Sequence, residues 1–326
     1  MAQLNRTQIE RVAQLIGQLP DDITPLNFYS FFTPEKEIVA TDMYPPLNHP
    51  ALAEFFMFAC LHQYGFWLSK SHGYDQPLVG KLNGRECKGS DLLWKSIWRY
   101  LERDGSGLEP NRLKEMSKEQ MWTELFVDDN GPIAFADRGL RLQITQEYGR
   151  QLMAEGLTAT RIIAQANERR RQLEAFVGQM KKIQGFAGDI FNKKILLLAM
   201  ALHNRPEQLL QVSDSYNWQP IVDYHLMRFA LRTGMVEIGK DETYLISHRY
   251  FVRPAVEHGI RKATFDAFSQ IIELSKRTMF FVDVVAWKAR RYCPEMSEPD
   301  CAKCAFQSVC AKRKDLFQPV YRTINY

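Results

Sequence analysis

Apolar residues spaced three and four positions apart recur along most of this chain of 326 residues. That spacing places them on one face of an α-helix, so it predicts amphipathic helices rather than strands. The segments with this pattern are 4–18, 50–69, 90–102, 137–154, 158–182, 193–203, 222–234 and 263–291. Strand patterns are weak, and only 235–247 reads as a hairpin or a loop. The sequence therefore predicts an all-α fold with two helical lobes.

Several helix starts are marked by residues that cap free backbone N–H groups. Ser117-Lys-Glu-Gln has the order of a capping box, and Thr158 precedes another predicted helix. Gly131-Pro132 marks a break between helices. Asp223 stands at the start of the helix predicted over 222–234, where a carboxylate usually acts as a cap.

Composition excludes several classes of protein. The formal net charge is +4, from 42 Lys+Arg against 38 Asp+Glu, and 45% of the residues are hydrophobic. These values exclude collagen, a coiled coil, long disorder and a disulfide scaffold. No run approaches roughly 18 apolar residues, and the N-terminus MAQLNRTQIERVAQL lacks the apolar core of a signal peptide. We expect a cytoplasmic, monomeric protein with no membrane partner.

Four of the six cysteines crowd into eighteen residues near the C-terminus with the spacing C-x7-C-x2-C-x5-C. They are Cys293, Cys301, Cys304 and Cys310. In a reducing compartment such a group predicts a metal site rather than disulfides. Four thiolates suit tetrahedral zinc or an iron–sulfur cluster. A single C-x2-C flanked by single cysteines wraps one compact loop, so we expect a 4Fe–4S cluster and keep zinc as the alternative.

The cysteine loop is locally basic. Residues 286–314 hold seven Lys or Arg and three acidic residues, a difference of +4. Such a loop suits contact with a phosphate backbone. It equally suits a solvated surface that offsets the negative charge of a cluster, and the sequence leaves both interpretations open.

The segment 181–234 has an order of residues that points to chemistry. A turn with Gly185 and Gly188 precedes Lys193 and Lys194, which open a strongly apolar helix. Asp223 follows about thirty residues later in PIVDYHLMR. An isolated Asp there would be read as a cap, but this order, followed by four cysteines, is more specific.

This order resembles the helix–hairpin–helix DNA glycosylase superfamily. The resemblance implies a hairpin that leads to a helix with a catalytic lysine, then a catalytic Asp, and in some members a four-cysteine loop that holds a 4Fe–4S cluster. Here the first cysteine spacing is one residue longer than the commonest C-x6-C-x2-C-x5-C, and the hairpin reads Gly185-Phe-Ala-Gly188 instead of G-x-G.

A second resemblance covers more of the chain. It is similar to the queuosine-salvage nucleotide N-glycosylases, which share the glycosylase core but lack the cysteine loop. The matching stretches are Pro45-Pro46, Tyr64-Gly-Phe-Trp67, SKEQMWTELF, PIAFADRGLRLQITQEYGRQL, the two lysines, VDYHL, VDVVAW and YRTINY. We therefore expect an N-terminal helical lobe over 1–155 that contributes base-pocket residues. A glycosylase-like core with the Lys and Asp would follow over 156–285, and the iron–sulfur loop and tail over 286–326.

The chemistry of an N-glycosidic bond assigns roles to these residues. Its cleavage builds positive charge on the sugar, which a buried carboxylate stabilises, and Asp223 is our choice for that role. Lys193 or Lys194 could attack the sugar as an amine, or hold a phosphate or base as a cation. Both also suit solvated lysines at a helix start. We expect simple hydrolysis by water, with one of the lysines as a positioning cation.

A flipped or free base needs aromatic rings on both faces. The aromatic candidates are Phe66, Trp67, Trp218, Tyr224 and Trp287, each of which also suits a hydrophobic core. Asp137 and Asp283 match salvage-family positions, which implies contact with base or ribose edges. His225 could orient Asp223 or contact phosphate. The run Arg169-Arg170-Arg171 reads as a solvated helix face.

Three classes of function remain. The first is a DNA glycosylase of the base-excision type that removes a modified purine or deazapurine, with DNA as its partner. The second is a hydrolase of a free modified nucleoside or its 5′-phosphate. The third is a non-catalytic DNA-binding protein. The cysteine loop favours the first class, the chain-wide resemblance favours the second, and the retained Asp and lysines argue against the third.

Overall fold

The computed structural model describes residues 2–21, 25–32 and 38–326. About half of the chain is helical, and the strands form only short two-stranded pairs. The fold is therefore mostly α, as the apolar periodicity predicts. In the described residues no helix is both long enough and apolar enough to cross a membrane.

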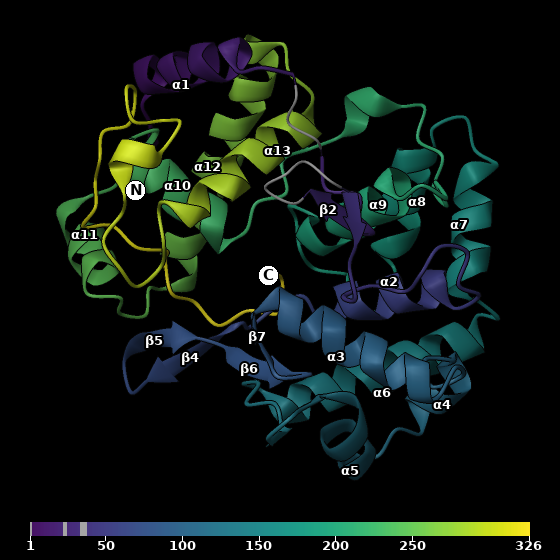
Figure 1. Cartoon of the computed structure of the whole chain (residues 1–326). Coiled ribbons are helices and arrows are strands. Elements are labelled where there is room, and N and C mark those ends of the chain that lie inside the picture. Colours follow the sequence, from purple (N-terminus) through teal and green to yellow (C-terminus); the bar gives the residue numbers. More distant parts are fainter. Residues whose placement is uncertain (1, 22–24, 33–37) are drawn as a thin grey trace. The chain divides into compact units, whose positions relative to one another are not determined.

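The chain divides into two compact units, each built from separate stretches of sequence (Figure 1). Unit 1 consists of Met1–Pro25, Leu68–Gln76 and Gln219–Arg322, and unit 2 of Leu26–Trp67, Pro77–Trp218 and Thr323–Tyr326. The sequence predicts contiguous domains with boundaries after residues 155 and 285. The stretches that form the two units of the structure instead alternate along the chain.

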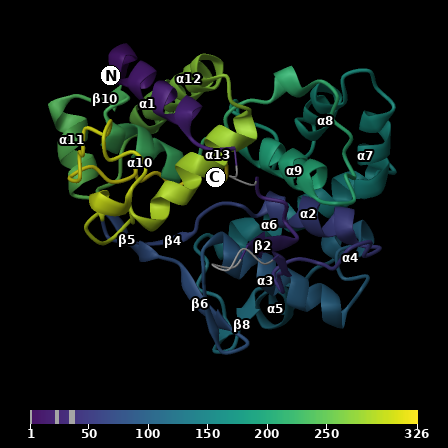
Figure 2. The same ribbon diagram turned by 45° about the horizontal axis from the view of Figure 1, so that its top comes forward.

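Unit 1 is organised around a long helix. Its helices are α1 (Arg6–Gln18), α10 (Tyr224–Thr233), α11 (Lys240–Ser247), α12 (Pro254–Ser275) and α13 (Met279–Lys288), followed by the 3₁₀ turns η3 (Ala289–Arg291) and η4 (Cys301–Lys303). Helix α1 lies against α12 in both views (Figures 1 and 2). Its contact face is apolar, and Ile9, Val12 and Ile16 are fully buried. The strand β1 (Gln3–Leu4) pairs antiparallel with β10 (Val236–Glu237), which fixes the N-terminus beside the end of α10.

Unit 2 is organised around the apolar helix α2 (Leu52–Leu61). Its other helices are α3 (Ser90–Arg103), α4 (Pro110–Lys114), α5 (Lys118–Gln120), the π-helix η1 (Met121–Leu125), α6 (Arg138–Ala154), α7 (Ala159–Asn167), α8 (Gln172–Met180), α9 (Lys193–Asn204) and the 3₁₀ turn η2 (Ser215–Asn217). Helix α2 contacts α3, α7 and α9. Every residue of α2 except Glu54 is buried, which is why its sequence is apolar all round.

The remaining strands make short pairs, of which β4–β5 lies mainly in unit 1 and the others lie in unit 2. They are β2 (Ser30–Phe32), β3 (Ile38–Ala40), β4 (Trp67–Lys70), β5 (Gly73–Pro77), β6 (Val79–Leu82), β7 (Arg85–Lys88), β8 (Val127–Asp128) and β9 (Gly131–Pro132). The pairs are β2–β3, β4–β5, β6–β7 and β8–β9, so each strand pairs with its neighbour in the chain.

The predicted caps are confirmed. Ser117 and Gln120 form a reciprocal capping box at the start of α5. The Thr158 side chain accepts the backbone N–H of Arg161 at 3.1 Å and so caps α7. The Asp223 side chain caps α10.

Some predicted helix boundaries are wrong. The segment 158–182 is two helices, because the chain bends over 168–171, so Arg169-Arg170-Arg171 lies in a bend and not on a helix face. The segment 263–291 is also divided, since Lys276 has φ +57° after α12 and Thr278 caps α13. The segment 50–69 stops being helical at Leu61, and 235–247 contains the helix α11.

Candidate functional site

The carboxylate of Asp223 has one bonded and one unbonded oxygen. Its Oδ1 accepts the backbone N–H groups of His225 at 2.8 Å and Leu226 at 3.1 Å, which are free donors of the first turn of α10. Within the described residues its Oδ2 has no hydrogen-bond partner. The side chain is half-buried. The helix N-terminus therefore fixes the orientation of this carboxylate and leaves one oxygen for another group.

A buried polar network holds the side chain next to it. The His225 Nδ1 atom lies 3.4 Å from Oε1 of Glu295 and 3.1 Å from Nη2 of Arg228. Glu295 is 3% exposed, and its Oε2 accepts the hydroxyl of Tyr74 at 2.8 Å. Burial, with the Glu295 charge adding to it, raises the pKa of Tyr74. The Tyr224 ring lies on the His225 imidazole at a centroid distance of 4.2 Å, so both predicted binding residues belong to this network.

The four loop cysteines lie around Arg232 of α10. The Arg232 guanidinium donates to Sγ of Cys293 at 3.1 Å, and the Cys310 thiol donates to the Arg232 carbonyl at 3.4 Å. Burial raises the pKa of the Cys310 thiol, and the charges of Cys293, Cys304 and Cys301 raise it further. All four thiols are half-buried and close enough to influence one another.

The sulfur atoms are near one another but are not arranged as metal ligands. Over residues 2–21, 25–32 and 38–326, no three His, Cys, Asp or Glu side chains form a group that could hold a metal ion. The donor set itself fits an anionic cluster, because four half-buried thiols are present and Nη2 of the 2%-exposed Arg232 has no hydrogen-bond partner. A buried guanidinium N–H without an acceptor calls for an explanation, and a thiolate cluster would supply the missing negative partner.

Much of the positive charge of the loop is paired within unit 1. The pairs are Lys303 with Asp300 at 3.0 Å, Lys314 with Glu298 at 2.6 Å and Arg313 with Asp315 at 3.1 Å. The Arg290 guanidinium lies 3.4 Å above the ring centroid of Trp287, so a cation covers one face of this predicted base-binding ring. Asp283 is half-buried on the same helix.

The two predicted catalytic lysines are buried in unit 2. Lys194 is 2% exposed and Lys193 is 6% exposed, so the interpretation as solvated lysines is wrong. The Lys194 Nζ atom donates to the carbonyl of Leu61 at 3.1 Å and to that of Gly185. The Lys193 Nζ atom lies 3.4 Å from the carbonyl of Gln63. Burial, with repulsion from Lys193, lowers the pKa of Lys194 from 10.5 to about 7.

Arg141 completes a set of cations at the end of α2. It is fully buried and donates to the carbonyls of His62, at 3.1 Å, and Tyr64. Its guanidinium lies 4.1 Å from the ring centroid of Tyr64 and 4.2 Å from that of Phe135. The last carbonyls of a helix lack intrahelical donors, and here Arg141 and the two lysines supply them. These cations therefore stabilise the end of α2, independently of any role in binding or catalysis.

The same region contains most of the buried polar atoms that lack a partner in the described part of the chain. They are His62 Nδ1, Gln63 Nε2, Tyr64 OH, Arg141 Nε and Asn192 Oδ1. Native interiors leave few such atoms unbonded, so a group of them indicates a bound ligand or bound water. The charge of Asp137 acts on both Tyr64 and Arg141, which brings this predicted binding residue to the same place.

The other predicted aromatic residues lie in differing surroundings. Phe66 is 5% exposed, with its ring 6.5 Å from that of Phe135, and Trp67 is 7% exposed. Phe66 therefore lies near the Arg141 region of unit 2. Trp218 is half-buried, 5.9 Å between ring centroids from His203.

Several residues of these networks, including Glu295, Arg232 and Arg141, are not among the site residues that the sequence predicts. Glu295 lies between the first two loop cysteines, and Arg232 lies one helical turn beyond Arg228. Arg141 lies within the motif PIAFADRGLRLQ. Only Arg141 carries a sequence signal, because that motif belongs to the stretches that resemble the salvage glycosylases.

Comparison with models of known protein families finds none that matches the chain, and comparison with curated proteins finds no significant match. The function is therefore argued from the chemistry of the side chains.

Proposed function

We propose that this protein is an N-glycosylase that hydrolyses the N-glycosidic bond of a modified purine or deazapurine nucleotide, with DNA as the preferred substrate. The proposal rests on the bonding of the Asp223 carboxylate. Two N–H groups fix one of its oxygens, and the other oxygen is unbonded. A fixed negative charge stabilises the positive charge that develops on the sugar when the bond to the base breaks. In a second function class, a non-catalytic DNA-binding protein, this carboxylate would serve only as the cap of α10.

In the proposed mechanism Asp223 acts on both the sugar and the water. Its unbonded oxygen faces the developing oxocarbenium ion and accepts a hydrogen bond from the attacking water. The base departs with the electron pair of the C–N bond, the water oxygen forms the new C–O bond, and the proton that Asp223 takes from this water is returned to the departed base. His225, held by Glu295 and Arg228, keeps the first turn of α10 in place and is a positioning residue in this scheme.

We propose that Lys193 or Lys194 acts as a cation that holds a phosphate or base of the substrate, and not as an amine that attacks the sugar. A lysine with a pKa near 7 is partly neutral at neutral pH, which suits a nucleophile. The Lys194 amine, however, is buried and donates to two backbone carbonyls. Borohydride should therefore trap no covalent adduct with substrate DNA. A trapped adduct that disappears in Lys194→Ala would show that the amine is the nucleophile.

We further propose that Cys293, Cys301, Cys304 and Cys310 hold a 4Fe–4S cluster, within a two-lobed, glycosylase-like helical fold. The unpartnered N–H of Arg232 beside the thiols supports an anionic occupant. When bound, the cluster would act as a structural cross-link for a loop with few apolar residues. Protein side chains, and not the cluster, would carry out base release.

A free modified nucleotide is the alternative substrate. Ion pairs within the loop use three of its basic residues, which lowers the charge available for a phosphate backbone. The unbonded polar atoms around Tyr64 also suit an enclosed small ligand.

Mass spectrometry of released bases separates these cases. Duplexes that carry modified purines or deazapurines, and the corresponding free nucleosides and 5′-phosphates, are incubated with the wild type and with Asp223→Asn. The matched control is Asp266→Asn, which alters a half-buried carboxylate paired with Lys262. We expect release from DNA by the wild type and the control, and none by Asp223→Asn. Release from free nucleotides alone would favour the alternative, and no release from any substrate would contradict the N-glycosylase proposal.

A further inference from the structure

The strands β6 and β7 form a two-stranded ribbon in unit 2 that packs against α3 and β8. Asn83 and Gly84 connect them with φ values of +53° and +73°, as in a type I′ turn. The register pairs Lys81 with Glu86 and Leu82 with Arg85. Because two positive φ values match the twist of the strands, this turn makes a tight and well-defined tip.

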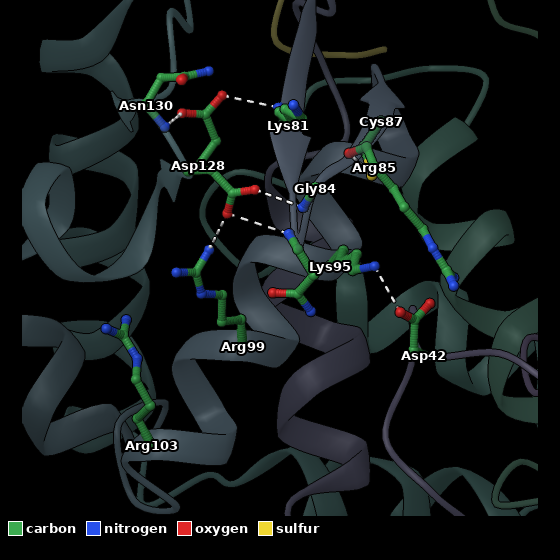
Figure 3. A network of polar contacts seen from close by, with 12 residues as sticks. Asp42, Lys81, Gly84, Arg85, Cys87, Lys95, Arg99, Arg103, Asp128 and Asn130 are labelled. Atoms are coloured by element: carbon green, nitrogen blue, oxygen red, sulfur yellow. Dashed lines mark hydrogen bonds and ion pairs between the residues drawn. The ribbon is translucent and has the colours of Figure 1, made fainter.

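Two aspartates, Asp129 and Asp128, of which Figure 3 labels Asp128, bind backbone N–H groups of the ribbon. Asp129 accepts the backbone N–H groups of Asn83 at 3.2 Å and Gly84 at 2.8 Å, and it also binds Arg99 at 3.2 Å. Asp128 accepts the backbone N–H of Lys81 at 3.0 Å. The N–H of Gly84 is the main cause that lowers the pKa of Asp129. The turn is therefore held by charge-assisted hydrogen bonds in addition to its own strand pairing.

Two cations of the ribbon, Lys81 and Arg85, have side chains that the described residues do not bind. Leu82 is fully buried, which anchors the inner face, whereas Lys81 and Arg85 are exposed. Neither of these two side chains has a hydrogen bond or ion pair to any described residue, and Figure 3 shows the Arg85 guanidinium with no bonded neighbour. The nearby aspartates bind backbone N–H groups of the ribbon instead of its cations. Residues 79–88 carry Lys81, Arg85 and Lys88 against Glu86, a net charge of +2.

We infer that the β6–β7 ribbon is an arm that contacts duplex DNA, with Lys81 and Arg85 bound to backbone phosphates. This inference rests on the proposed function insofar as the substrate is DNA. A two-stranded ribbon fits the major groove of B-DNA, and contacts to phosphate fix the orientation of a protein on the duplex. The backbone that carries Lys81 and Arg85 is already held by Asp128 and Asp129, so only the two side chains lose conformational freedom on binding, which is less than a flexible loop would lose.

The test measures affinity for an unmodified duplex as a function of salt, which is independent of base release. The test variant is Lys81→Gln/Arg85→Gln, and the control is Lys181→Gln/Lys182→Gln, which removes the same charge from exposed positions at the end of α8. Figures 1 and 2 both place α8 on the opposite side of unit 2 from β6. Fluorescence anisotropy is recorded between about 50 and 200 mM salt, the range over which phosphate contacts change affinity strongly.

We expect the test variant to lower the slope of log K against log salt by about two, one for each phosphate that the ribbon no longer neutralises, while the control keeps the wild-type slope. Its far-UV circular dichroism spectrum and melting temperature should equal those of the wild type, which shows that the fold is intact. Duplex binding with an unchanged slope in the test variant would overturn the inference and leave the proposed function standing. Absence of duplex binding by the wild type would also overturn it, and base release from free nucleotides would then show which part of the proposed function survives.

Discussion

At the scale of single residues, the two oxygens of the Asp223 carboxylate have different roles. A single substitution can remove one role and keep the other. One oxygen accepts two N–H groups of α10, and the other has no partner in the described residues. An amide retains the accepting oxygen and loses the charge. The cap was predictable from sequence, because an Asp before an amphipathic helix is a local signal. The unbonded oxygen was not, because it depends on what surrounds the helix in space.

Asp223→Asn should keep the fold and lose activity. We expect base release to fall by about 10²- to 10³-fold or more, the usual effect of removing one group that stabilises transition-state charge. The melting temperature should stay close to that of the wild type, since Asn is also a good cap. Asp223→Ala, by contrast, should lose about 1 kcal/mol of stability as well as activity. Wild-type turnover in Asp223→Asn would remove this residue from the mechanism.

Lys194 should give the protein a measurable pH dependence of stability. Its pKa is lowered from 10.5 to about 7 in the folded state, whereas it returns towards 10.5 on unfolding. Between these values the unfolded chain binds one more proton, so the free energy of unfolding rises with pH by at most about 1.4 kcal/mol per unit. Below pH 7 both states are protonated and this contribution is flat.

The comparison with Lys194→Met isolates this effect. Thermal unfolding between about pH 7 and about pH 9 should shift in favour of the wild type relative to the variant, because only the wild type gains stability from deprotonation. Lys182→Met, at an exposed position, should follow the wild type at every pH. Parallel curves for the wild type and Lys194→Met would show that the amine keeps its proton over this range.

At the scale of elements, α10 connects the proposed catalytic carboxylate with the cysteine loop. Asp223 caps its first turn, and Arg232 in its last turn binds Sγ of Cys293 and the carbonyl of Pro294. Arg228, between them, binds His225 and Gln318. A displacement of the cysteine loop would therefore act on side chains along the whole length of α10.

Cys304→Ser should remove the metal and destabilise the loop. We expect the wild type, purified without oxygen, to be brown and to hold about four irons per chain. Cys304→Ser should lose iron and solubility before any effect on the chemistry of Asp223 can be measured. Cys87→Ser is the control, because Cys87 lies on β7, outside the loop. Zinc without iron in the wild type would exclude the iron–sulfur proposal.

The sequence predicted helix boundaries correctly where a capping residue or a change in composition marks them, and incorrectly where neither signal is present. The bend over 168–171 itself contains no Gly or Pro, and Asp214 caps α8 there from about 40 residues away. The β6–β7 ribbon carried the hairpin signal Asn83-Gly84, but its strands have few β-branched residues, so the periodicity did not indicate strands. The burial of the lysines depends on carbonyls of residues 61–63, which no local pattern reveals.

At the scale of the whole molecule, unit 1 is assembled from three stretches of chain. The N-terminal stretch supplies α1, which covers an apolar face of α12, and Leu68–Gln76 supplies Tyr74, which binds Glu295. A contiguous C-terminal piece would therefore lack two of its three parts.

A fragment of residues 219–326 should fail to fold alone. Without α1, the surface of α12 that buries Ile9, Val12 and Ile16 would be open to water. We expect a poorly dispersed NMR spectrum from the fragment, which a peptide of residues 2–21 improves when it is added. A dispersed spectrum from the fragment alone would contradict the assignment of α1 to the core of unit 1.

The interleaving of the units also has a consequence for the order of events on the ribosome. Helix α1 ends at residue 18 and its partner α12 begins at residue 254, so about 236 residues are made between them. At roughly 5 to 20 residues per second, the apolar face of α1 waits on the order of 10 to 50 seconds for its partner. Most of unit 2 is complete before then. The nascent chain therefore exposes the apolar face of α1 for much of its synthesis. A chaperone that binds such a segment is expected to matter more for this protein than for one with its units in sequence order.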